Sequence, residues 1–136
     1  MKPEEQRIAI AKACGWKQLF KGEHDRYLRF SPPPERKPEY KYGAYIQGIG
    51  HTSILKKEYL VDELPDYLND LNEIHEAEKT LNRGQKSDFQ SYLGEMFPRD
   101  SDGDSTGWEG MFSRAIHATA SQRSEAVLKC LSLWRD

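Results

Sequence analysis

Apolar residues recur at helical spacing in the first part of the chain and predict two helices there. Residues 3–14 begin with a proline, carry acidic residues in the first turn and are followed by Gly15, which is suited to end a helix. Residues 65–83 carry an apolar stripe that includes Leu68, Leu71 and Ile74, and Gly84 is expected to end this second helix.

The last part of the chain predicts a third helix. It is expected to begin at Thr119 or Ser121, both suitable N-cap residues, and to run to Trp134. Residues 88–97 have helical spacing of their apolar positions, but the segment is short and also fits a strand, so both assignments stay open.

Between the first two helices the pattern changes to short strands. We expect strands over residues 17–20, 26–30, 42–49 and 54–61, interrupted by the proline-rich loop 31–35, and another strand over 111–117. This order of elements predicts an α/β fold of layered helices and strands in a single domain spanning residues 1–136.

Composition and charge narrow the class of protein. The 136 residues are 37% hydrophobic and 31% charged, and the apolar runs are too short to cross a membrane. No segment resembles a signal peptide, and the two cysteines do not form a disulfide framework, so we expect a soluble cytoplasmic protein with reduced thiols. A net charge of −2 argues against a non-specific nucleic-acid binder.

Motifs that would indicate catalysis or metal binding are missing from the sequence. It contains no P-loop, dinucleotide fingerprint or nucleophile elbow, and no pair of histidines or cysteines at metal-ligand spacing. The acidic run from Asp100 to Asp104 starts like a calcium loop, but Ser105 and Met111 stand where glycine and glutamate are required. We therefore predict a binding protein, not an enzyme, with no cofactor and no metal.

The most suggestive binding segment is WEGMFSRAIHATASQR at 108–123. It leads into the N-terminus of the third helix, where free backbone N–H groups and the helix dipole favour an anion. Trp108 offers a ring that could stack on a base, and arginine offers a forked donor for phosphate. The predicted ligand-binding residues are Arg114, His117, Thr119, Ser121, Arg123 and Trp108. The ordinary alternative is that serine caps the helix and the arginines lie on the surface.

Three segments together resemble the phage ABA-sandwich domain family of small phage and prophage proteins. They are IAIAKACGWK at 8–17, LPDYLNDLNEIHEAEKTL at 64–81 and IHATASQRSEAVLKCLSLW at 116–134. The resemblance implies a three-layer α-β-α sandwich with an antiparallel or mixed sheet covered by helices, and it favours a strand within 88–97. Relative to the family pattern, residues 31–61 look like an insertion, and the acidic loop at 100–107 looks extended.

The resemblance also implies a function, because the family includes a protein that sequesters the cyclic ADP-ribose signal of Thoeris immunity. We therefore expect an anti-defence sponge that binds a cyclic nucleotide or cyclic ADP-ribose-type signal without turnover, as a dimer or higher homo-oligomer in the host bacterial cytoplasm. The alternative is an acidic protein–protein inhibitor of a host nucleic-acid-binding or defence protein. Residues 58–109 contain fourteen acidic and four basic residues, which favours that alternative.

Overall fold

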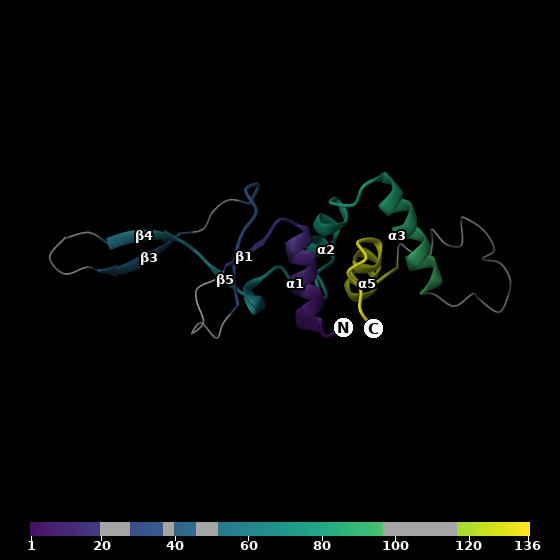
Figure 1. Cartoon of the computed structure of the whole chain (residues 1–136), viewed down its shortest axis with the longest axis horizontal. Helices are drawn as coiled ribbons and strands as arrows, with labels where there is room; N and C mark the ends of the chain where they lie inside the picture. Colours follow the sequence, from purple (N-terminus) through teal and green to yellow (C-terminus); the bar gives the residue numbers. More distant parts are fainter. Residues whose placement is uncertain (20–27, 37–39, 46–51, 97–116) are drawn as a thin grey trace. The chain divides into compact units, whose positions relative to one another are not determined.

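The computed structural model describes residues 1–19, 28–36, 40–45, 52–96 and 117–136 (Figure 1). The chain divides into two compact units. One unit combines Met1–Cys14 with Pro65–Asp136, and the other is the continuous segment Gly15–Leu64. In the parts described, the first unit holds the helices α1, α2, α3 and α5, and the second holds the strands β1 to β5.

The first helix forms as the sequence predicts. Helix α1 spans Pro3–Ala13 with Cys14 as its C-cap, and Gly15 follows with a φ of +92°. That backbone conformation is open to glycine at little cost, so Gly15 ends the helix for the expected reason. Ile10 and Ala11 are its fully buried residues.

The predicted second helix, 65–83, is wrong as a single element. Residues 66–70 form a turn in which the N–H groups of Asn69 and Asp70 donate to the Asp66 carbonyl. Helix α2 then spans only Leu71–Glu78, and the Asp70 side chain accepts a hydrogen bond from the Asn72 N–H at its start. An N-cap of this kind starts a helix, because it satisfies an N–H group that has no partner within the helix.

A new helix, α3, spans Arg83–Glu95, so Gly84 lies in its first turn and does not end the preceding helix. Asn82 and Gln85 form a reciprocal capping box: the Gln85 N–H donates to the Asn82 side chain at 2.8 Å, and the Asn82 N–H donates to the Gln85 side chain at 2.9 Å. The helical spacing within 88–97 is therefore correct through Glu95, and the strand favoured there by the family resemblance is wrong over that range.

The last helix, α5, spans Ala120–Cys130 and packs against α1, α2 and α3 (Figure 1). It is shorter than predicted, because the chain leaves the helix before Trp134. Ser132 adopts a φ of +57°, and the N–H groups of Leu133 and Trp134 both donate to the Leu128 carbonyl. The fully buried side chains of Ala126, Val127 and Leu128 place this helix at the centre of the helical unit's core.

The strands form two antiparallel sheets in the described part of Gly15–Leu64. Strands β1 (Lys17–Leu19), β2 (Arg29–Ser31) and β5 (Tyr59–Leu60) make one sheet in the order β1-β2-β5, and β3 (Tyr40–Tyr45) pairs with β4 (Thr52–Lys56) in the other. The strand predicted over 54–61 is thus divided between two sheets, and its last residue, Val61, already belongs to a short 3-10 turn, η1 (Val61–Glu63). The predicted strand at 111–117 falls almost entirely outside the described residues.

The core of the strand unit is aromatic. Trp16 and Tyr59, each 4% exposed, meet edge to face with ring centroids 5.0 Å apart, and Phe30 is fully buried. Helices together with antiparallel strands are consistent with the predicted α/β class. No helix in the described ranges is long and apolar enough to cross a membrane.

Candidate functional site

The structure describes four of the six residues predicted to bind the ligand. Trp108 and Arg114 lie outside the part of the chain that the structure describes, as does the acidic run Asp100 to Asp104. His117, Thr119, Ser121 and Arg123 lie inside it, at the start of α5. Their positions show what the N-terminus of that helix offers and which of these side chains are already engaged.

Thr119, not Ser121, is the N-cap of α5. Its hydroxyl accepts a hydrogen bond from the Gln122 N–H at 3.2 Å, and the Gln122 side-chain carbonyl accepts one from the Thr119 N–H at 2.9 Å. This capping box fixes the backbone where the extended segment becomes helix. Ser121 occupies the second helical position and is exposed, so its hydroxyl can face a ligand.

Exposure alternates through residues 117–121. His117, Thr119 and Ser121 are exposed, while Ala118 and Ala120 are 3% and 5% exposed. The two buried alanines hold the segment against the core, and the polar residues between them face solvent. The start of α5 therefore presents hydroxyl and imidazole groups beside the positive end of the helix dipole, which is an arrangement suited to an anion.

Arg123 faces the helical unit's interior. Its guanidinium Nη1 lies 2.8 Å from a carboxylate oxygen of Glu78 in α2, and its Cζ lies 6.0 Å from the centre of the Phe89 ring in α3. The side chains of Arg123 and Glu78 are only 13% and 20% exposed. Arg123 therefore links α5 to α2 and α3, a packing role that its sequence position did not indicate.

Buried polar contacts also join α5 to the segment before α2. The Ser124 hydroxyl, fully buried, donates to the Tyr67 carbonyl at 2.7 Å. This bond spans 57 residues of sequence and replaces the water that both groups would otherwise bind. The N-terminus of α5 is thus held by an ion pair and a buried hydrogen bond, and a ligand there would meet a preorganised backbone.

The cysteines are free and partly buried. Burial raises the pKa of the Cys130 thiol to about 11, with the negative charge of Asp88 acting in the same direction. Burial also raises the pKa of Cys14, which a hydrogen bond with Tyr67 partly offsets. Both groups are thiols near neutral pH, and an uncharged thiol is a poor nucleophile. Within the described ranges, no group of three or more His, Cys, Asp or Glu side chains is arranged to hold a metal ion.

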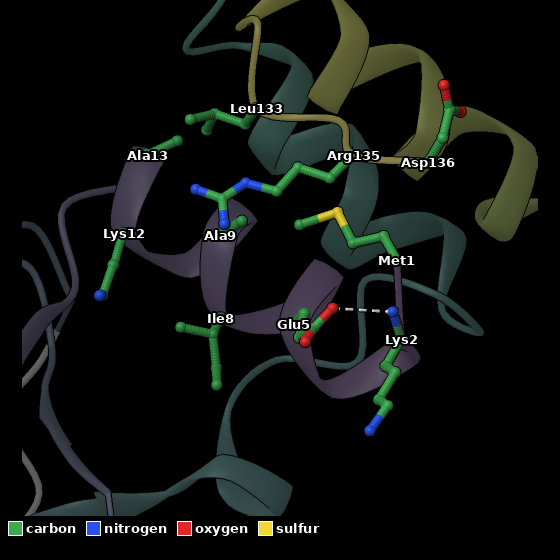
Figure 2. Close-up of a pocket in the computed structure, with 10 residues that line it drawn as sticks. All are labelled: Met1, Lys2, Glu5, Ile8, Ala9, Lys12, Ala13, Leu133, Arg135 and Asp136. Atoms are coloured by element: carbon green, nitrogen blue, oxygen red, sulfur yellow. Dashed lines mark hydrogen bonds between the residues drawn. The ribbon is translucent and has the colours of Figure 1, made fainter.

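A pocket elsewhere in the helical unit was not anticipated from the sequence. A pocket of about 840 Å³ opens between α1 and the segment that follows α5 (Figure 2). Its residues come from both ends of the sequence given, from Met1 to Ala13 and from Leu133 to Asp136. The sequence holds one sign of this pocket. Helix α1 carries the apolar residues Ile8, Ala9 and Ala13 in addition to Ile10 and Ala11, which are the residues it buries in the core.

Comparison of the chain with protein-family models, with curated proteins and with solved structures gives no match.

Proposed function

We propose that this protein is a phage-encoded binding protein that sequesters a cyclic nucleotide or cyclic ADP-ribose-type immune signal without turning it over. The observation that carries the proposal is the start of α5, where exposed His117, Thr119 and Ser121 stand at the positive end of an eleven-residue helix. The resemblance of three segments to the phage ABA-sandwich family supplies the class of ligand.

In this mechanism the protein acts by mass action. It binds the signal tightly and lowers the free concentration below what the defence effector requires. The N–H groups of Ala120 and Ser121 at the first two helical positions would face a phosphate, since these positions have no acceptor within the helix. Arg114 and Trp108 would supply a second phosphate contact and a stacking ring. Arg123 would hold the helix in place through Glu78.

The same resemblance supports three further parts of the proposal. The fold would be a three-layer α-β-α sandwich in one domain, with residues 31–61 as an insertion. The protein would form a dimer or a higher homo-oligomer. It would act in the cytoplasm of the infected bacterium. Light scattering coupled to size-exclusion chromatography measures the oligomeric state directly.

A thermal-shift screen against cyclic ADP-ribose isomers and cyclic di- and trinucleotides tests the function. A ligand that binds only the folded state raises the melting temperature by an amount set by its concentration relative to Kd. A sponge returns its ligand intact after heat denaturation, whereas an enzyme returns fragments. The absence of a shift across the panel would contradict the proposal.

A single substitution separates binding from folding at this site. Ser121→Asp adds a negative charge at the start of α5, which the helix dipole favours by about 0.3–1 kcal/mol, so folding stability should hold or rise. The same charge repels a phosphate, so affinity for the ligand should fall at least about tenfold, equivalent to 1.4 kcal/mol. Ser91→Asp adds the same charge on an exposed position of α3 and is the matched control. Equal affinity in both variants would rule out this site.

The acidic inhibitor is the second candidate, and exposed acidic side chains favour it. Asp70, Glu76, Asp88 and Glu95 are all exposed on the helical unit. Asp70 is a poor choice for charge reversal, because its side chain caps α2. Asp88→Lys with Glu95→Lys reverses two exposed charges without breaking a cap. If this candidate is correct, the protein binds no nucleotide, and the double substitution should abolish its salt-sensitive capture of a basic host protein.

A further inference from the structure

The pocket beside α1 has an apolar lining. Ile8, Ala9 and Ala13 line it from one face of the helix, and Leu133 and Met1 line it from the two ends of the sequence given (Figure 2). Leu133 is 39% exposed, a large apolar side chain left in contact with solvent. A volume of about 840 Å³ lies within the range typical of small-molecule sites.

The acidic side chains at the pocket already have partners. The Glu5 carboxylate accepts a hydrogen bond from the Lys2 N–H at 3.0 Å, drawn as the dashed line in Figure 2. The Asp136 carboxylate accepts one from the Trp134 indole N–H at 3.2 Å. Both carboxylates are thus oriented by local bonds and keep their negative charge, but the three basic side chains that line the pocket, Lys2, Lys12 and Arg135, outnumber them.

The basic side chains at the pocket are available. Within the part of the chain that the structure describes, the side chains of Lys2, Lys12 and Arg135 make no ion pair and no hydrogen bond. Figure 2 shows Arg135 extending from the C-terminal segment toward α1, with its guanidinium beside the apolar lining. Arg135 is an exposed residue, and its guanidinium can bind an anion through two parallel N–H bonds.

From this arrangement we infer that the pocket binds a small amphiphile with an apolar body and one anionic group, with Arg135 as the residue that binds the anion. The apolar body lies against Ile8, Ala9 and Leu133, where it removes apolar surface from water. Lys2 and Lys12 add positive potential at the rim and raise the rate of encounter with an anion. A concave site of this size fits a discrete molecule better than a flat lipid surface.

This site is separate from the proposed nucleotide site. The pocket lies beyond the C-terminal end of α5, whereas Thr119 and Ser121 lie at its N-terminal end. An eleven-residue helix is roughly 16 Å long, so the two sites do not share contacts. A variant at either site is therefore expected to leave binding at the other unchanged.

Calorimetric titration of the full chain with decanoate, below its micelle concentration, tests the inference. Decyltrimethylammonium has the same alkyl chain with the opposite charge and is the matched ligand. We expect binding of decanoate and at least tenfold weaker binding of the cation. Equal binding of the two ligands, or no binding of decanoate, would overturn the inference.

Substitutions in and outside the pocket test whether decanoate binds there. Arg135→Gln, in an exposed segment, should weaken decanoate binding about tenfold, a change of 1.4 kcal/mol. Ala9→Phe should weaken it further by filling the pocket, and circular dichroism checks that this variant folds. Lys86→Gln removes an exposed positive charge from α3 and should have no effect. Unchanged affinity in Arg135→Gln would refute the assigned role.

A vesicle experiment shows whether the anionic amphiphile is a free small molecule or a lipid in a membrane. The protein is sedimented with phosphatidylglycerol vesicles in parallel with the decanoate titration. Binding of decanoate without sedimentation supports a small-molecule site. Sedimentation with vesicles and no binding of monomeric decanoate would show that the surface recognises a membrane, and the inference would be wrong.

Discussion

The ion pair between Arg123 and Glu78 allows a quantitative test of how the helical unit is held together. The two side chains are 13% and 20% exposed and their charged atoms are 2.8 Å apart. Removing one partner of a fully buried pair costs about 3–5 kcal/mol, whereas an exposed pair contributes only about 0.2–1 kcal/mol. Because the carboxylate would keep some contact with water, we expect Arg123→Met to lower the free energy of unfolding by about 2 kcal/mol.

Methionine is the appropriate replacement, because its chain retains the packing over Phe89 while the charge is removed. At this chain length each kcal/mol shifts the melting temperature by roughly 3–4 °C, so the expected decrease is about 7 °C. Glu78→Gln should also destabilise the protein, and the double variant should lose less than the sum of the two. The difference, a coupling of about 1–2 kcal/mol, measures the pair itself.

The exposed pair Glu76–Lys79 is the control. Its side chains are 66% and 69% exposed, so Lys79→Met should change the melting temperature by less than about 2 °C. Thermal unfolding followed by circular dichroism gives all of these values. If Arg123→Met melts within about 1 °C of the parent, the pair contributes nothing to stability and the packing role assigned to Arg123 is wrong.

Four further predictions concern single residues. Ser124→Ala removes the donor to the Tyr67 carbonyl and should cost about 1–3 kcal/mol in urea denaturation, because a buried acceptor loses a partner; no loss would mean that the bond contributes nothing. Gly84→Ala should stabilise the protein by about 0.5–1 kcal/mol, since the new Cβ meets its nearest atom at 3.6 Å within a helix. Gly15→Ala should destabilise it, because φ is +92° there and the new Cβ lies 3.1 Å from Pro33; the same sign for both glycines would contradict this reasoning. Labelling of Cys130 with iodoacetamide should be slow at pH 7 and accelerate about tenfold per pH unit toward its pKa of about 11, because burial disfavours the thiolate; a plateau near pH 9 would refute the shift.

Parts of the fold could be predicted because their causes are local. Pro3, the acidic first turn and Gly15 fix α1 within a residue of its observed ends. The spacing of Phe89, Tyr92 and Leu93 is helical in α3, where the family resemblance pointed to a strand. The break between α2 and α3 also has a local signal, since Asn82 and Gln85 form a capping box across three positions, but the apolar stripe running through 65–83 obscured it.

The candidate site shows the limit of such reasoning. An exposed Ser121 and a helix start at Thr119 follow from residues that are neighbours in the chain. The orientation of the Arg123 side chain cannot be predicted in this way, because its partner Glu78 lies 45 positions away in the sequence. A sequence shows that an arginine is charged, but only packing decides whether a carboxylate or the solvent meets it.

Residues that are close in the chain were enough to predict elements whose hydrogen bonds close locally: α1 with the glycine that ends it, the start of α5 at Thr119 or Ser121, and strands between Lys17 and Leu60. Only the tertiary structure decided which segments meet. It divided the strand predicted over 54–61 between β4 and β5, bonded Ser124 to Tyr67 and brought Ala9 and Arg135 to one pocket. The physical reason is that backbone bonds of caps and turns are satisfied locally, whereas burial and ion pairing depend on partners that distant parts of the chain supply.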